Sequence, residues 1–230
     1  TSIEKNSETD NPFWRECSDA ELQFSIRGLK PQEGMTVKRF ATRAQLLDQI
    51  NKQQQQLRQL DRSRLFDRYR SRALELVLSD KARLAFDVTQ ESDAMREQYG
   101  RHLYGQSALV ARRLIEAGTR FVTVQYDCVD GYSWDSHRNS DDVKEHLLPT
   151  FDQAFAALVN DLDERGLLDE TLIVAMGEMG RTPKANSTWG RNHWSTLFPA
   201  VLAGGGVKRG FVFGETDKHA GYATAHPVSP

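Results

Sequence analysis

Two short stretches of the chain carry side chains of the kinds that bind metal ions. The first is WDSHRN (residues 134–139), in which Asp135 stands two positions before His137. The second is GRNHWS (190–195), which contributes His193. Carboxylate oxygens and imidazole nitrogens are ligands that suit zinc, manganese and iron. One aspartate and two histidines can hold an ion and leave a position open for catalysis, so we predict a metal site at these three residues.

Each of these residues also has an ordinary interpretation. An aspartate and a histidine two positions apart are common in loops, where the aspartate caps a helix and the histidine faces solvent. His193 could equally be a core histidine that packs against Trp194. The residue types alone leave both interpretations open.

GEMGRTP (177–183) contributes two more candidates, Glu178 and Arg181. Glu178 ends an apolar run and lies between Gly177 and Gly180, and glycines allow the backbone to come close to a ligand. We predict that Glu178 is a catalytic carboxylate or a further metal ligand. We predict that Arg181 acts in catalysis by binding a phosphate or sulfate group as a bidentate donor. The alternative is a plain ion pair between the two at the edge of a sheet.

Arg191 and Lys218 complete the predicted substrate-binding residues, together with Arg181. Lys218 lies in GETDKHAGY (214–222), which could line a substrate cleft or be a solvated loop. The glycines at 204–206 are not followed by GK[ST], so they predict a turn and not a phosphate-binding loop. No GxSxG elbow is present to indicate a serine hydrolase.

Helices and strands, which must position these residues, are predicted to alternate along the second half of the chain. Amphipathic patterns predict helices at 107–118 and 141–166, and apolar runs predict strands at 120–126, 171–177 and 197–206. This alternation is typical of a mostly parallel sheet covered on both faces. Ligands of such sheets gather beyond the carboxyl ends of the strands, where the aspartate–histidine pair and the glutamate stand.

The chain divides by pattern into three regions. Residues 1–35 are polar and predict an irregular arm. In residues 36–100, apolar residues recur every three or four positions, which predicts a solvent-facing helical subdomain. Residues 101–230 would then form a partial α/β core, and the loop-like ends lead us to expect a chain cut at both termini.

The amino-acid composition limits the kinds of partner that the protein is expected to have. The 230 residues are 39% hydrophobic and 27% charged, as in soluble proteins with a core, and the net charge of −2 gives no reason to expect a nucleic acid. No apolar stretch approaches the roughly 18 residues of a membrane span. The two cysteines, Cys17 and Cys128, are predicted to be free. The oligomeric state is left open.

Three runs of the sequence resemble the bacterial DUF1501 family. They are RFVTVQYDCVDGYSWDSHRN (120–139), LLDETLIVAMGEMGRTP (167–183) and the stretch from GRNHW to PVSP (190–230). The resemblance is strong over 105–230 and looser over 36–100. The family is linked to the alkaline phosphatase and sulfatase superfamily, so the resemblance implies an alkaline-phosphatase-like three-layer α/β sandwich with a mostly parallel sheet and a helical N-terminal insertion.

The resemblance also implies a set of metal ligands. Asp135 and His137 look like the superfamily's aspartate–histidine pair before a long helix, although their spacing is shorter than usual, and His193 looks like the later histidine that joins them. The implied ion is zinc, with manganese or calcium as alternatives. The superfamily usually has an aspartate followed by a histidine where this chain has Glu178 and Met179. Methionine does not replace histidine for a hard cation, which puts a second metal in doubt.

The implied function is the metal-dependent hydrolysis of phosphate or sulfate esters of a small molecule or polysaccharide, in the periplasm or outside the cell. The superfamily's nucleophile comes from an earlier segment that this sequence lacks, so we expect little hydrolysis by this chain alone. The alternative is a catalytically inactive member that acts as a binding or scaffold protein.

Overall fold

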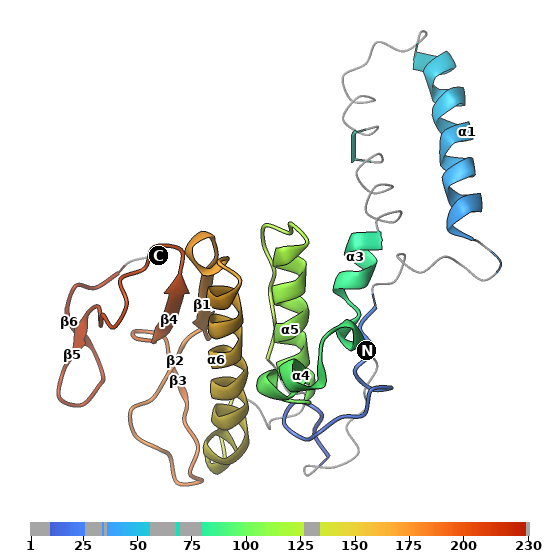
Figure 1. Ribbon diagram of the computed structural model, residues 1–230. Coiled ribbons are helices and arrows are strands. Elements are labelled where there is room, and N and C mark those ends of the chain that lie inside the picture. Colours follow the sequence, from blue (N-terminus) through green and yellow to red (C-terminus); the bar gives the residue numbers. More distant parts are fainter. Residues whose placement is uncertain are drawn as a thin grey trace.

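The computed structural model describes residues 10–25, 34, 36–55, 68–69, 80–126 and 134–228. Figure 1 shows the helices α1 (Val37–Gln55), α3 (Asp80–Ala85), α4 (Asp93–Tyr99), α5 (Leu103–Glu116) and α6 (Leu148–Glu164). Shorter helical turns are η1 (Val88–Gln90), η2 (Val143–Leu147) and η3 (Leu168–Glu170). The strands are β1 (Leu172–Met176), β2 (Gly180–Arg181), β3 (His193–Trp194), β4 (Ala200–Gly204), β5 (Glu215–Thr216) and β6 (Ala223–Ala225).

The main core lies among α4, α5 and α6. Tyr99, Leu109 and Ala154 are fully buried there, with Val88 of η1 beside them. The predicted helix at 107–118 is confirmed as α5, which starts earlier because the His102 ring nitrogen Nδ1 accepts from the Gly105 N–H at 3.0 Å. An imidazole here takes the place of the usual N-cap oxygen and satisfies a backbone donor that the helix leaves unpaired.

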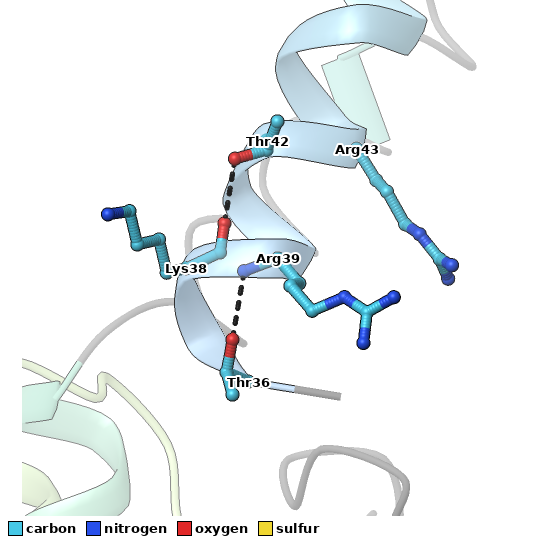
Figure 2. Close-up of a pocket in the computed structure, with 5 residues that line it drawn as sticks. All are labelled: Thr36, Lys38, Arg39, Thr42 and Arg43. Carbon is cyan, nitrogen blue, oxygen red and sulfur yellow. Dashed lines mark hydrogen bonds between the residues drawn. The ribbon is translucent and has the colours of Figure 1, made fainter. Parts of the chain in front are cut away.

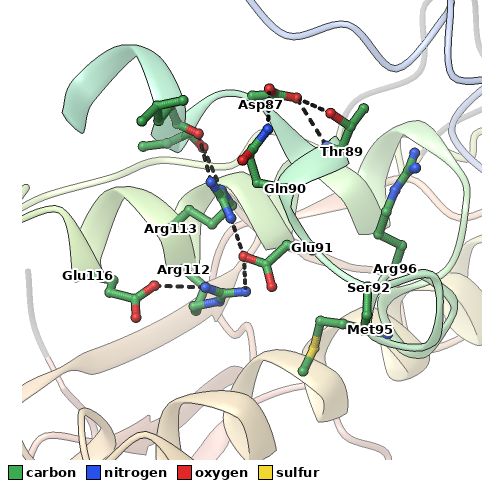
Figure 3. A network of polar contacts seen from close by, with 12 residues as sticks. Asp87, Thr89, Gln90, Glu91, Ser92, Met95, Arg96, Arg112, Arg113 and Glu116 are labelled. Atoms are coloured by element: carbon green, nitrogen blue, oxygen red, sulfur yellow. Dashed lines mark hydrogen bonds and ion pairs between the residues drawn. The ribbon is translucent and has the colours of Figure 1, made fainter. Parts of the chain in front are cut away.

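A buried ion network links these helices, and Figure 3 shows the part of it in which Arg112 meets Glu91 and Glu116. Arg112 of α5 is fully buried, and its guanidinium forms ion pairs with Asp161 of α6 at 2.7 Å, Glu116 at 2.8 Å and Glu91 at 3.0 Å. The Tyr99 hydroxyl donates to Asp161 at 2.9 Å. A buried cation must be paired to be tolerated, so this network fixes how α4, α5 and α6 meet.

The arm before α1 packs against the start of α5. The Leu103 N–H donates to the Pro12 carbonyl and the Cys17 N–H donates to the Arg101 carbonyl, both at 2.8 Å. Cys17 is free, as predicted, and burial raises the pKa of its thiol. Cys128 lies outside the described residues.

The predicted parallel sheet is wrong. In the described part of the chain the strands form three separate two-stranded sheets, β1–β4, β2–β3 and β5–β6, and each pair is antiparallel. There is accordingly no alkaline-phosphatase-like three-layer sandwich among these residues. The strands predicted at 171–177 and 197–206 exist as β1 and β4, and the one at 120–126 pairs with none of the described strands.

The connection between the strands explains the error. Parallel neighbours need a crossover of a dozen or more residues, usually a helix. Between β1 and β4 the chain forms only β2, β3 and turns, so β4 returns beside β1 in the opposite direction, with Val174 opposite Leu202. An apolar run predicts that a strand forms, and the connection decides which way it runs.

The helix predicted at 141–166 is confirmed in two parts, η2 and α6. Pro149 stands in the first turn of α6, directly after the π-helical turn η2. The turn before it widens into the π-helical η2, whose last residue is Leu147. The chain therefore turns directly from the predicted metal-binding loop into the long helix that packs on α5.

The first helix stands apart from the core in Figure 1. Leu46, Leu47 and Ile50 of α1 are exposed, in agreement with a solvent-facing segment. Much of the stretch between α1 and α3 falls outside the described residues, so the helical subdomain and the three-region division stay predictions. Within the described part, no helix combines the length and the apolar character needed to cross a bilayer.

β1 and β4 leave apolar side chains uncovered on one face of their sheet. Leu172, Val174 and Met176 alternate along β1 and are 49–58% exposed, and Leu202 opposite Val174 is 48% exposed. Figure 1 shows α6 between this sheet and α5. The core formed by α4, α5 and α6 is therefore more fully packed than the strand-containing part.

Candidate metal centre

Three potential ligand atoms from distant parts of the sequence meet at one point. His193 Nε2 lies 3.0 Å from Asp135 Oδ1, and His137 Nε2 lies 3.1 Å from each of those two atoms. These three residues are the one group of at least three potential metal ligands among the described residues. The predicted convergence of Asp135, His137 and His193 is thus present in the fold.

The triangle has the dimensions that a metal ion needs. With sides near 3.1 Å, an ion with bonds of about 2.1 Å would lie about 1 Å out of the plane of the three atoms and reach all of them. Both ring nitrogens also lie within hydrogen-bonding distance of the same carboxylate oxygen, and the tautomer of each ring decides which atoms donate. Two imidazoles with one carboxylate suit zinc or manganese better than calcium, which takes oxygen ligands.

All three ligand side chains are reachable from solvent. The side chains of Asp135, His137 and His193 are 54%, 44% and 49% exposed. The interpretation of His193 as a core histidine packed on Trp194 is therefore wrong. Trp194 instead turns its indole N–H to the Gly221 carbonyl at 2.7 Å and packs edge-on against Tyr222.

A small antiparallel hairpin presents His193. Arg181 of β2 lies directly opposite His193 of β3, so their side chains leave the hairpin on the same face. The neighbouring Gly180 is buried, and a Cβ there would stand 1.7 Å from the Leu197 carbonyl oxygen. The close backbone contact that a glycine allows therefore holds the hairpin that carries His193.

The loop that carries the other two ligands is held by backbone hydrogen bonds to the segment before β3. The Arg191 N–H donates to the Ser136 carbonyl at 2.8 Å, and the Asn139 N–H donates to the Thr188 carbonyl at 3.1 Å. A third bond runs from the Ser140 N–H to the Trp189 carbonyl at 2.8 Å. These bonds bring Asp135 to His193, although 58 positions separate them.

Arg181 adds a positive charge beside the triangle. Its Nη1 lies 2.6 Å from Asp135 Oδ1, and its Nη2 lies 3.4 Å from Glu178 Oε1. Hydrogen bonding from His193, with further contributions from Arg181 and His137, lowers the pKa of the Asp135 carboxyl. Asp135 is therefore ionised at neutral pH, as a metal ligand must be.

Glu178 does not join the triangle. Its side chain is 64% exposed, and it forms the ion pair with Arg181 that was the alternative interpretation of this stretch. The group of converging ligand atoms includes no atom of Glu178. Its role as a fourth ligand or catalytic carboxylate stays a prediction, and its contact is with the arginine that touches Asp135.

The other two basic residues lie in different settings. Arg191 Nη1 donates to the carbonyls of Thr182 and Pro183 at 2.7 and 2.6 Å, which holds the chain after β2. Lys218 is exposed on the turn before β6, where Asp217 accepts from two backbone N–H groups. The roles of Arg191 and Lys218 in substrate binding stay predictions.

A second basic surface surrounds the start of α1 (Figure 2). The Arg39 N–H donates to the Thr36 hydroxyl at 3.2 Å, and the Thr42 hydroxyl donates to the Lys38 carbonyl at 2.9 Å. With Arg43, all of the residues that line this hollow belong to a single helical segment. Among the described residues, no group from another element lines the hollow, which there has the character of a solvated helix surface.

Comparison with known protein families assigns the chain to one of them. The model of the family described as "Protein of unknown function (DUF1501)" matches residues 6–230. The chain belongs to the DUF1501 family. This DUF1501 match covers the helical region and the segments that carry Asp135, His137 and His193, and it confirms the resemblance of the three runs to the family. No curated protein and no solved structure matches the chain.

Proposed function

We propose that this DUF1501 protein is a metal-dependent hydrolase of phosphate or sulfate esters, with Asp135, His137 and His193 holding one divalent ion. The observation that carries the proposal is the triangle of ligand atoms with sides of 3.0–3.1 Å at the protein surface. The two nitrogen ligands favour zinc, with manganese as the alternative.

The residues around the triangle fit an anionic substrate. A bound ion would polarise an ester oxygen and stabilise the charge that develops on the departing group. The Arg181 guanidinium places a second positive charge within 2.6 Å of Asp135. Glu178 pairs with the same guanidinium and would orient it. Because the three ligands are about half exposed, a substrate can reach the open side of the triangle.

A second candidate is a binding or scaffold protein that holds a metal without turnover. Two observations favour it. Arg181 is already paired with Asp135 and Glu178, and Arg191 is committed to backbone carbonyls. The Ser136 hydroxyl, between two of the ligands, is largely buried and turns to the Arg138 carbonyl and the Ser140 hydroxyl at 3.2 Å each. Ser136 is thus engaged within its own loop.

Zinc titration against a chromogenic chelator tests the metal site first. We expect one zinc ion per chain, and loss of that ion in Asp135→Ala and His193→Ala. His219→Ala is the matched control, because His219 is exposed and lies outside the triangle. Wild-type protein that does not take up zinc or manganese would refute the proposed site.

Hydrolysis assays then separate the two candidates. Aryl phosphate and aryl sulfate are offered to the zinc- or manganese-loaded chain, with Asp135→Ala as the negative control. Turnover above the control supports the hydrolase. Because little hydrolysis is expected of this chain alone, any reproducible rate above that of Asp135→Ala counts as turnover, and stoichiometric binding of metal without such an excess supports the binding protein.

A further inference from the structure

We infer that Asn186 is a positioning residue for the ligand His137; this inference rests on the proposed metal site. The Asn186 amide Nδ2 donates to the backbone carbonyl of His137 at 3.0 Å. Its Oδ1 accepts from the N–H groups of Thr188 and Gly190 at 3.0 and 2.9 Å, and from the Thr188 hydroxyl at 2.9 Å. The Asn186 side chain therefore stabilises its own loop and also binds that loop to the backbone carbonyl of His137.

Gly190 holds the same peptide from a second side. It is buried, and a Cβ at this position would stand 1.9 Å from the His137 carbonyl oxygen and 2.0 Å from its carbon. Any other residue would force the two segments apart. The His137 peptide thus lies against bare backbone at Gly190 while its carbonyl accepts from Asn186.

The His137 ring is also oriented by this segment. Its Nδ1 faces Asn192 Oδ1 at 3.5 Å, while its Nε2 points to the triangle. In metal sites, a hydrogen bond to the second ring nitrogen fixes the tautomer and leaves the first nitrogen free to bind the ion. Residues 186–192 therefore control both the backbone and the ring of His137, and His193 follows them directly.

The conformation of the loop supports a specific role. Trp189 has a φ of 58°, a left-handed conformation that is unfavourable for a bulky side chain. Its indole N–H donates to Asp141 at 3.0 Å, which holds the residue there. Strained backbone of this kind persists where the surrounding structure enforces it, and it clusters at functional sites. Formation of the ligand triangle is thereby coupled to closure of the 186–190 loop on His137.

The variant Asn186→Asp isolates the contact with His137. The carboxylate can still accept from Thr188 and Gly190, but it loses the donor that faces the His137 carbonyl. We expect zinc affinity to fall by about 10- to 100-fold, as is usual when an outer-shell partner is lost. A new negative charge near a cation site would by itself strengthen binding, so a loss of affinity identifies positioning and not electrostatics.

The control is Asn160→Asp, the same change at an exposed position of α6. Zinc affinity is measured by chelator competition, and the visible spectrum of the cobalt-loaded protein reports the geometry around the ion. We expect Asn186→Asp to change both and Asn160→Asp to change neither.

The outcomes separate this inference from the proposed function. If wild-type protein binds no metal, the proposed metal site itself is refuted. If wild type binds zinc and Asn186→Asp binds it within twofold with the same cobalt spectrum, the positioning role is overturned. Gly190→Ala provides a second route, because it disturbs the same peptide and leaves Asn186 intact. It too should lower the affinity for zinc, and unchanged affinity in this variant would also contradict the coupling.

Discussion

Burial of His102 should make the protein less stable in mild acid. The ring is 5% exposed and caps α5, and desolvation lowers its pKa from 6.5 to about 4. In the unfolded chain the same ring takes up a proton near pH 6.5. As the pH falls from 6.5 towards 4, the unfolded state therefore binds a proton that the folded state excludes, and folding becomes less favourable.

The size of this effect follows from the two pKa values. A difference of one pKa unit corresponds to about 1.4 kcal/mol. Linkage then predicts that the free energy of unfolding is about 2 kcal/mol lower at about pH 5 than at about pH 8, and about 3 kcal/mol lower at about pH 4. The carboxyl groups with lowered pKa values, such as Asp87 and Asp135, stabilise the fold above the ordinary value of 3.8 and lose that contribution only as the pH falls below it. The change in the free energy of unfolding between pH 6.5 and pH 5 therefore reports mainly on histidine.

Urea unfolding followed by circular dichroism at a series of pH values measures the effect. The comparison is His102→Asn, because an asparagine can cap the helix as the histidine does but does not titrate. We expect the variant to lose the slope of stability against pH between 6.5 and 5, whatever its stability at neutral pH. An identical slope in wild type and variant would show that burial of His102 does not cause the acid sensitivity.

Three further predictions concern the core and the metal site. Asp161→Ala removes a partner of the buried Arg112 and should lower the free energy of unfolding by about 3–5 kcal/mol in urea melts; a loss below 1 kcal/mol would mean that its other partners suffice. Zinc at a free concentration of about 100 times its dissociation constant should stabilise the fold by about 2.7 kcal/mol, and an excess of chelator or His193→Ala should abolish the gain in a thermal melt. Glu178→Gln should bind zinc within about twofold of wild type in chelator competition, because Glu178 lies outside the triangle; a tenfold loss would restore it as a ligand.

The residues of the candidate site could be picked out by their types, while the architecture that brings them together could not. Asp135, His137 and His193 stand out because carboxylate and imidazole are side chains that bind divalent metals. Their meeting depends on backbone hydrogen bonds between segments about 50 positions apart, and no local pattern encodes those bonds. Gly190 was the available signal, since a glycine before a candidate ligand can mark a close backbone approach.

The helices could be predicted from the sequence more accurately than the sheets. Periodic apolar residues identify α5 and α6, because a helix completes its hydrogen bonds within itself. A strand completes them with a partner, so the apolar runs of β1 and β4 predicted strands without specifying direction. Residues 120–126 show the limit of the pattern, since their alternation is that of a strand and yet they pair with no described strand.

The difference in packing between the two parts of the molecule has a dynamic consequence. An isolated pair of strands is marginally stable, and local opening is easiest where few apolar contacts resist it. Amide protons of β1 and β4 should therefore exchange with solvent sooner than those of α5, whose Leu109 and Arg112 are fully enclosed. Asp135, His137 and His193 thus lie in the less stable part of the protein, where the binding of an ion, as proposed, would stabilise a region that the chain alone holds weakly.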